Sequence, residues 1–381
     1  MMHNLHLLEE SLMTKSTTIK ARKTLDKIQP YSPGKPIWEV QKELGLDRVI
    51  KLASNENPLG PSPKAVAAIQ HGLAELNRYP DADASDLKKA IAKEFQVNPQ
   101  QVIPTNGADE LITLISEAFL EAGDEVIVPS PSFSEYDFGA HIMGATVVPV
   151  EFSKGFEFDV DAMIAAVTDK TKIIYVCTPN NPTGTYMSKA DLDKLVEAID
   201  DVLVVIDAAY SHFADAVDYT NGIEYINAGY PVLTLQTFSK IYGIAGVRVG
   251  FGIASESIIQ SILKVKEPFN VNTLAQIAAT AAIEDTEHVT TSQNANKAGR
   301  EQLYKAFNEL GLPYIESMAN FVLVQIGENG EKLYKELMAK GVIVRHGKIW
   351  GLPDYVRVSV GTQEENQFFI DTLTSLVAKQ A

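Results

Sequence analysis

The chain has very little cysteine and no long hydrophobic run. Its 381 residues include one cysteine, Cys177, which cannot form an internal disulfide or a multi-cysteine zinc site, and we expect no bound metal. Such a low thiol content is typical of a protein from a reducing compartment. No apolar stretch is long enough to cross a bilayer, and residues 1–15 lack the basic-then-apolar order of a signal peptide. We therefore expect a soluble, cytoplasmic protein with no membrane partner.

Basic residues are also in deficit. The chain carries 33 Lys and Arg against 49 Asp and Glu, which gives a formal net charge of −16. Binding along a phosphate backbone requires a basic face, so this balance argues against nucleic acid as a partner. Hydrophobic residues make up 45% of the chain and charged residues 22%, which is the composition of a globular protein and excludes disorder as its main state. The sequence contains no internal repeat or low-complexity linker, so domain boundaries must come from changes of pattern.

The pattern along the chain predicts an N-terminal arm, a large α/β domain and a smaller α+β domain. Residues 1–35 are weakly periodic and end in a Pro- and Gly-rich stretch, which indicates an arm that lies on the rest of the molecule or on a second subunit. Residues 61–275 alternate short β-rich runs with helical segments, which predicts a mainly parallel sheet of the seven-stranded type covered by helices. Residues 36–60 and 276–381 would form the small domain. In it we expect a long helix to residue 310, strands at 320–326, 342–345 and 355–360, and helices at 330–340 and from 363.

Four apolar runs of the predicted large domain are each followed by a side chain that could bind a ligand or take part in catalysis. Ligands bind outside the carboxyl ends of the strands in parallel α/β sheets. We therefore expect an aromatic ring, an amide, a carboxylate and a lysine to meet in one region. These residues are Phe133 after the run 125–128, Asn181 after 172–176, Asp207 after 203–206 and Lys240 after 232–237.

Lys240 and Asp207 are the candidates for covalent and acid–base chemistry. A lysine that is partly desolvated loses its proton readily and can form a Schiff base, although most lysines are solvated surface residues. Asp207 ends a fully apolar run, where an ionised carboxylate needs a cationic or donating partner such as a protonated pyridine nitrogen. A helix N-cap is the alternative role for this aspartate. Tyr210, three residues later, is either part of the same pocket or a buried core residue.

A phosphate site is indicated at the start of the helix that follows residues 105–107. Free amide groups at a helix N-terminus bind phosphate, but every helix has such an end, so this signal is weak alone. Ser239 and Arg248 lie on either side of Lys240 in the sequence and could complete the anion site, Arg248 with a two-pronged contact. The turn at 181–184 is either a plain tight loop or a device that fixes the Asn181 amide at a strand end.

Together, these motifs resemble a known family. In order and spacing, Asn-Pro-Thr-Gly at 181–184, Asp-Ala-Ala-Tyr at 207–210 and Thr-Phe-Ser-Lys at 237–240 are similar to the pyridoxal 5'-phosphate (PLP) dependent aminotransferases of fold type I. Further segments resemble the histidinol-phosphate aminotransferase branch of that family. They are residues 30–36, 51–58, 60–63, 78–81, 106–110, 319–321 and 357–362. One departure is Ala208, where many relatives have Glu, and it weakens assignment to a narrow subgroup.

The resemblance implies a role for each matching residue around PLP. Lys240 would hold the cofactor covalently and move a proton, Asp207 would pair with the pyridine nitrogen, and Tyr210 with Asn181 would contact the ring oxygen. Phe133 would stack on the ring. The cofactor phosphate would be held by Gly107, Ala108, Asp109, Ser239 and Arg248, with Tyr79 reaching it from the neighbouring subunit of a homodimer.

The resemblance also implies a substrate site and an activity. Arg357 would grip the anionic end of the substrate, with Tyr31, Asn55 and Arg345 as further pocket residues, whereas a surface ion pair is the alternative for both arginines. The implied reaction transfers an amino group from histidinol phosphate to 2-oxoglutarate, giving imidazole acetol phosphate and glutamate, a step of histidine biosynthesis. An aromatic amino acid aminotransferase, which shares these motifs, stays open.

Two other classes also stay open. A PLP-dependent decarboxylase acting on an amino-acid phosphate would release carbon dioxide and need no oxo-acid acceptor. A catalytically idle binding protein with this fold would be expected to lack Lys240, Asp207 or Arg357, all of which are present.

Overall fold

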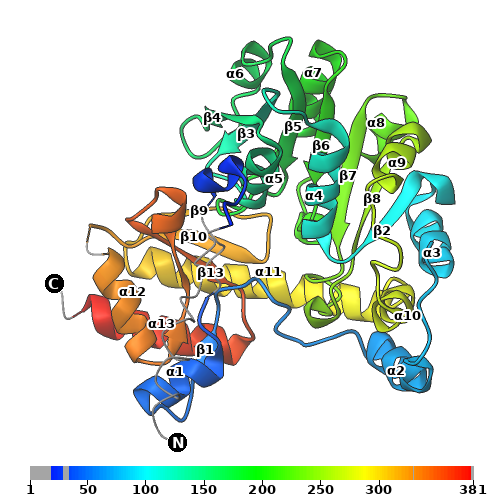
Figure 1. The fold of residues 1–381 in the computed structure, drawn as a ribbon. Coiled ribbons are helices and arrows are strands. Elements are labelled where there is room, and N and C mark those ends of the chain that lie inside the picture. The colour runs from blue at the N-terminus through cyan, green and yellow to red at the C-terminus, as the bar shows by residue number, and fades with distance from the viewer. Residues whose placement is uncertain (1–18, 29–33, 329, 379–381) are drawn as a thin grey trace, which may run out of the picture.

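The largest element of the fold is a seven-stranded sheet in the order β2-β8-β7-β6-β5-β3-β4 (Figure 1). The computed structural model describes residues 19–28, 34–328 and 330–378. In this sheet only β8 runs antiparallel to its neighbours. The predicted mainly parallel α/β fold is therefore confirmed. The strands are β2 (Val102–Thr105), β3 (Glu125–Ser130), β4 (Thr146–Glu151), β5 (Thr171–Cys177), β6 (Leu203–Asp207), β7 (Val232–Thr237) and β8 (Gly250–Ala254).

Helices cover both faces of this sheet because its central strands are apolar on both sides. In β6, Val204 and Ile206 belong to the core on one face, while Leu203 and Val205 belong to the core on the other. Such alternation is dictated by the period of two residues along a strand. Residues of α4 (Ala108–Phe119), α5 (Glu135–Met143) and α9 (Glu256–Leu263) pack on the second face. On the first face pack α2 (Pro63–Gly72), α3 (Ser85–Phe95), α6 (Val160–Ala165), α7 (Lys189–Ala198), α8 (Ile223–Asn227) and α10 (Thr273–Ala282).

A second group of elements lies beside the large sheet and has its own core. A four-stranded antiparallel sheet has the order β12-β13-β10-β9, and β1 pairs in parallel with β11. The long helix α11 runs from beside α10 to this second group (Figure 1). The elements are α1 (Ile37–Leu44), β1 (Ile50–Lys51), α11 (Thr286–Glu309), β9 (Tyr314–Ile315), β10 (Phe321–Gln325), α12 (Gly330–Ala339), β11 (Val342–Ile343), β12 (Arg345–His346), β13 (Tyr355–Ser359) and α13 (Gln363–Val377).

Short 3-10 helices complete the described chain, and the first lies against α5. There the guanidinium of Arg22, directly before the helix, donates to the carbonyl oxygen of Ile142 at 2.6 Å. The rest of the predicted arm lies largely outside the described residues. The 3-10 helices are Lys23–Lys27, Leu73–Glu75, Pro99–Gln101, Ser211–Phe213, Ala245–Val247 and Gly347–Trp350.

Two sequence predictions for the second group were wrong in detail. The long helix expected up to residue 310 is two helices, because the chain leaves α10 after Ala282 and turns at Asp285. The carboxylate of Asp285 accepts a hydrogen bond from the hydroxyl of Ser62 at 2.6 Å, which ties the turn to the start of α2. The strand expected at 342–345 is also divided, since β11 pairs with β1 and β12 pairs with β13. The division into domains at residues 60 and 275 stays a prediction, and its second boundary falls within α10.

Candidate active site

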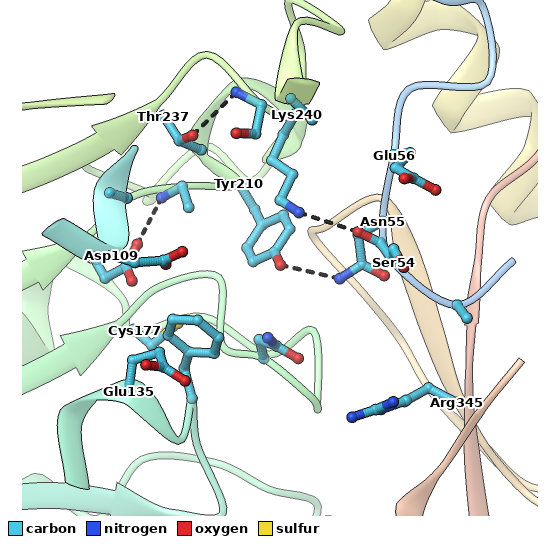
Figure 2. A pocket seen from close by; sticks show the side chains of 18 of the residues that line it. Ser54, Asn55, Glu56, Asp109, Glu135, Cys177, Tyr210, Thr237, Lys240 and Arg345 are labelled. Carbon is cyan, nitrogen blue, oxygen red and sulfur yellow. Dashed lines mark hydrogen bonds between the residues drawn. The ribbon is translucent and has the colours of Figure 1, made fainter. Parts of the chain in front are cut away.

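A cavity of about 430 Å³ opens at the carboxyl ends of β3, β5, β6 and β7. Its size is typical of small-molecule sites. The ring of Phe133, the amide of Asn181, the carboxylate of Asp207 and the amine of Lys240 all line it, so the convergence predicted from the strand ends is present. The opposite wall is formed by residues 53–56 and by side chains from β12 and β13 (Figure 2).

Lys240 extends from the loop after β7 into the cavity. Its Nζ donates a hydrogen bond to the carbonyl oxygen of Ser54 at 3.2 Å and lies 5.7 Å from the centroid of the Tyr210 ring (Figure 2). Burial, and next the positive charge of Arg357, lower the pKa of this amine from 10.5 to about 8. A substantial fraction is therefore neutral near pH 8, as a nucleophilic lysine requires.

Asp207 is the last residue of β6 and is 4% exposed. Its Oδ2 accepts a hydrogen bond from the hydroxyl of Tyr136 at 2.6 Å, and its Oδ1 accepts one from the backbone N–H of Ala209 at 3.0 Å. Burial raises the pKa of the carboxyl to about 6, and these two donors oppose the rise. The following 3-10 helix is capped by Tyr210, so the N-cap role is not the one that Asp207 takes. A buried carboxylate at a cavity wall is suited to a cationic N–H partner.

Tyr210 is held in the cavity by Asn55. The Asn55 side-chain N–H donates to the hydroxyl of Tyr210 at 3.0 Å (Figure 2). The position of Asn55 is set in turn by Ser359, whose hydroxyl donates to Asn55 Oδ1 at 2.8 Å. Burial raises the pKa of the Tyr210 hydroxyl well above its usual value, so the phenol keeps its proton near neutral pH. Both side chains line the cavity.

Arg357 is a buried residue of β13 that reaches the cavity from the side opposite the large sheet. Its side chain is 5% exposed, which does not fit the alternative of a surface ion pair. The guanidinium donates to Asn181 Oδ1 and, at 2.8 Å, to the carbonyl oxygen of Ala53. It lies between two aromatic rings, 5.2 Å from the centroid of Phe321 and 5.0 Å from that of Trp350. These contacts fix the orientation of its planar fork.

Arg345 stands directly opposite Arg357 in the antiparallel pair of β12 and β13. Side chains of residues that face each other across two strands point to the same side of the sheet. Arg345 also lines the cavity, and Figure 2 shows it on the side of the pocket opposite Glu135. Two like charges placed opposite each other repel, and a bound anion would lower the energy of this arrangement.

The start of α4 forms the part of the cavity that we expected to bind phosphate. Ala108, Asp109, Ser239 and Arg248 all line it. Arg248 Nη2 lies 3.1 Å from Asp109 Oδ2. Gly107 is not a lining residue, but a Cβ atom there would lie 2.5 Å from Arg248 Nη2, and its φ of +81° is unfavourable for other residues. The absent side chain of Gly107 therefore leaves room for the guanidinium at the helix N-terminus.

One of the expected site residues lies apart from this arrangement. Tyr79 does not line the cavity of its own chain; its ring is 83% exposed and stacks on Phe269 with 4.8 Å between the centroids. Tyr31 lies outside the described residues. The roles assigned to the individual site residues remain proposals.

Sequence reasoning missed several residues that the fold brings to the site. Glu135 lines the cavity, where burial and the charge of Asp109 raise the pKa of its carboxyl. Tyr136 contacts Asp207 from behind, across a separation of 71 residues in the chain. Glu135 and Tyr136 lie just after Phe133, at the start of α5, and this proximity was the available signal. Ser54 contributes a backbone carbonyl oxygen, for which no side-chain pattern exists.

Comparison with known proteins identifies the family. Residues 47–373 match the family model described as aminotransferase class I and II. A histidinol-phosphate aminotransferase of Moorella thermoacetica is 46% identical over 365 residues, which cover 95% of this chain and 94% of that protein. One from Caldicellulosiruptor saccharolyticus is 42% identical over 358 residues, with 93% and 99% covered. The chain belongs to the aminotransferase class I and II family, and the family resemblance read from its motifs is confirmed.

Solved structures agree with this assignment. The histidinol-phosphate aminotransferase from Clostridium acetobutylicum superimposes with a TM-score of 0.81 at 25% identity, covering 87% of this chain and 100% of that one. The enzyme from Sinorhizobium meliloti in complex with pyridoxal-5'-phosphate gives a TM-score of 0.88 at 23% identity, with 96% and 100% covered. The second likeness concerns the fold alone. Transfer of an amino group between an amino donor and a 2-oxo acid is the reaction class of the family.

Proposed function

We propose that this protein is a PLP-dependent aminotransferase that transfers the amino group of histidinol phosphate to 2-oxoglutarate, forming imidazole acetol phosphate and glutamate. The observation that carries the proposal is the meeting, in one cavity, of the Lys240 amine, the Asp207 carboxylate and the N-terminus of α4 with Arg248 beside it. The relatives at 46% and 42% identity that bear the name histidinol-phosphate aminotransferase support the choice of substrate.

The residues around the cavity fit PLP. Lys240 has a lowered pKa and would hold the aldehyde carbon covalently. Asp207 is a buried carboxylate that would pair with the pyridine nitrogen, and Phe133 offers an apolar ring to stack on. The N–H groups at the start of α4, with Ser239 and Arg248, would hold the phosphate. When bound, PLP supplies an electron sink that stabilises negative charge on the α-carbon of the substrate.

Lys240 would do the proton transfer. With PLP in place, the Nζ of Lys240 would act as the base that takes the proton from the substrate α-carbon. The Ser54 carbonyl oxygen and the Tyr210 ring restrict where this Nζ can go. Asp207 would pair with the protonated pyridine nitrogen and so support the electron sink that PLP supplies.

The paired arginines favour a phosphorylated substrate. Arg345 and Arg357 face each other across β12 and β13 and both line the cavity. Guanidinium groups bind phosphate and carboxylate through two parallel hydrogen bonds. Histidinol phosphate presents a doubly charged phosphate and glutamate presents carboxylates, so the same pair would serve both halves of the reaction. Phenylalanine carries a single carboxylate and would therefore form fewer hydrogen bonds with the two arginines.

A panel of amino donors tests this function. The purified protein with bound PLP is mixed with histidinol phosphate, glutamate, phenylalanine or tyrosine, and the change in cofactor absorbance is followed in single turnovers. We expect histidinol phosphate and glutamate to react with the highest kcat/KM. Preference for phenylalanine or tyrosine over histidinol phosphate would replace our proposal by the aromatic aminotransferase alternative. Release of carbon dioxide without formation of a 2-oxo product would indicate the decarboxylase.

We also propose that the protein acts as a homodimer. Tyr79 is exposed in the single chain, and other large apolar side chains are exposed near it. Clusters of exposed apolar side chains mark interaction surfaces. A second subunit that covers this patch would bring a Tyr79 ring toward a neighbouring site, as the resemblance implies. The apolar patch consists of Leu73, Leu76, Tyr79 and Phe269.

A further inference from the structure

We propose that Tyr136 is a positioning residue that holds Asp207 in its ionised form and aims it at the pyridine nitrogen of the cofactor. This inference rests on the proposed PLP chemistry and extends it to a residue that lies behind the cavity wall. Three features of Tyr136 carry it: its hydrogen bond, its packing and its burial.

The hydrogen bond is short and isolated from solvent. The Tyr136 hydroxyl donates to Asp207 Oδ2 at 2.6 Å, a length typical of a neutral donor on a charged acceptor. Tyr136 is 0% exposed and Asp207 is 4% exposed, so water does not replace this donor easily. Burial and the negative charge of Asp207 raise the pKa of the Tyr136 hydroxyl well above its usual value. The phenol therefore keeps its proton and remains a donor.

Packing fixes the ring that carries this hydroxyl. Tyr136 stacks on Tyr175 of β5, with 4.3 Å between centroids and 13° between planes. Its other neighbour is Phe133, whose ring meets it edge to face at 5.7 Å and 81°. Tyr136 is thus wedged between the central sheet and the ring proposed to stack on the cofactor. Packing therefore holds the Tyr136 hydroxyl within hydrogen-bond distance of Asp207.

Within the described part of the chain, no second side chain donates a hydrogen bond to Asp207. On the opposite oxygen, the Ala209 N–H donates at 3.0 Å. Cys177 is the register partner of Asp207 on β5, and its thiol pKa is raised far above the usual value by burial, so it stays uncharged. The positive charge of Lys240 lowers the pKa of the Asp207 carboxyl and the like charge of Asp109 raises it, both less than the hydrogen bond from Tyr136 lowers it. Among the residues that the structure describes, Tyr136 is therefore the side chain that donates a hydrogen bond to the Asp207 carboxylate.

The chemical consequence concerns one proton. A donor to the carboxylate makes it less basic, so the shared proton stays on the pyridine nitrogen and the ring remains an electron sink. Without that donor the carboxylate becomes more basic and draws the proton toward itself. The pyridine is then closer to neutral and stabilises the α-carbanion less.

The test compares Tyr136→Phe with Tyr175→Phe. The first variant removes only the hydroxyl on Asp207 and keeps the stacked ring. The second is the matched control, since the Tyr175 hydroxyl is equally buried and forms no hydrogen bond with the residues that the structure describes. Each protein is loaded with PLP labelled with nitrogen-15 in the ring, and its nitrogen chemical shift is recorded beside kcat, KM and the thermal midpoint.

We expect Tyr136→Phe to move the nitrogen shift toward that of neutral pyridine and to lower kcat about tenfold or more, with KM changed less. Tyr175→Phe should leave the nitrogen shift as in the wild type. An unchanged nitrogen shift and kcat in Tyr136→Phe would overturn the inference, as would an equal change in both variants, which would indicate a packing effect. If the wild-type protein takes up no PLP at all, the proposed function fails instead, so the two failures are distinguishable.

Discussion

At the scale of single residues, the amine of Lys240 sets the pH at which the protein can capture its cofactor. Burial and Arg357 lower its pKa from 10.5 to about 8, so the neutral amine accumulates at lower pH than in an ordinary lysine. The rate of covalent PLP uptake by the apoprotein should rise with pH and level off above about pH 8. Stopped-flow absorbance from pH 6 to 10 measures this rate. Free lysine with a blocked α-amine serves as the control, because PLP itself titrates in the same range. If the rate for the protein rises with pH up to pH 10 as the rate for the blocked lysine does, the pKa of Lys240 is not lowered.

The same pKa shift predicts an effect on stability. A lysine whose pKa is lower in the folded state than in the unfolded state opposes folding while it is charged. Through Lys240, stability should therefore rise as the pH increases from about 8 to 10.5. Lys240→Met should remove this dependence and stabilise the apoprotein at pH 7 by about 1–3 kcal/mol. Urea denaturation of both proteins at pH 7 and pH 10 measures the difference, and a variant less stable than the wild type at pH 7 would contradict it.

Arg357 belongs to the residue scale as the grip on the substrate. Arg357→Ala should keep covalent PLP on Lys240 but lower kcat/KM for histidinol phosphate and glutamate by about 30-fold to several thousand-fold, because charge-assisted contacts in a partly closed site are lost. Arg357→Lys should lower kcat/KM less than Arg357→Ala does, because lysine keeps the positive charge but lacks the planar fork of the guanidinium. Arg48, which stacks on Phe368, provides a control in Arg48→Ala. Wild-type kcat/KM in Arg357→Ala for every donor would show that the proposed grip lies elsewhere.

The sequence allowed us to predict those site residues that directly follow a strand. Phe133, Asn181, Asp207 and Lys240 follow four apolar runs, and the topology of a parallel sheet brings such positions together. Tyr136 could not be found in this way, because its contact with Asp207 depends on how α5 packs on the face of the large sheet. No period or motif encodes that packing.

At the scale of elements, the junction between α4 and β8 supports the proposed phosphate site. A Cβ atom at Gly250 would lie 2.7 Å from the backbone nitrogen of Ala108 and 2.9 Å from the carbonyl carbon of Gly107. Backbone atoms cannot move aside as a flexible side chain does. Gly250→Ala should therefore push α4 away from the sheet, lower stability by about 1–3 kcal/mol and weaken PLP binding.

The control for Gly250→Ala is Gly246→Ala. A Cβ atom at Gly246 would meet nothing within 4 Å, so this variant should keep both properties. Thermal midpoints and equilibrium dialysis of PLP measure the two effects. Equal behaviour of the two alanine variants would show that close approach at this junction is unimportant.

Element boundaries were the part of the fold least available from sequence. The mainly parallel sheet was predicted and confirmed, because runs such as 203–206 are apolar on both faces. The break between α10 and α11 was not predicted from the sequence, because it depends on the hydrogen bond between Ser62 and Asp285, which are 223 residues apart. The opposition of Arg345 and Arg357 depends on the register of two short strands. Alternation of apolar residues predicts strands but not which strand will be the neighbour.

At the scale of the whole molecule, the apolar patch around Tyr79 predicts an obligatory dimer. Leu76→Asp, on a side chain that is 54% exposed, should shift the protein toward monomers and reduce PLP retention, because a charge would be buried in the interface. Sedimentation velocity at assay concentrations measures the first effect and dialysis the second. Val217→Asp is the control, since Val217 is fully exposed on a separate loop between the 3-10 helix Ser211–Phe213 and α8. A wild-type protein that sediments as an active monomer would refute the dimer.

The central claim is that this protein moves the amino group of histidinol phosphate to 2-oxoglutarate, and transfer of that nitrogen tests it most directly. Histidinol phosphate labelled with nitrogen-15 at its amino group is incubated with 2-oxoglutarate and the PLP-loaded protein, and the products are analysed by mass spectrometry. We predict labelled glutamate and imidazole acetol phosphate in equal amounts, and none of either with Lys240→Ala. Absence of labelled glutamate from the wild-type reaction, with an active preparation shown by turnover of another donor, would contradict the account.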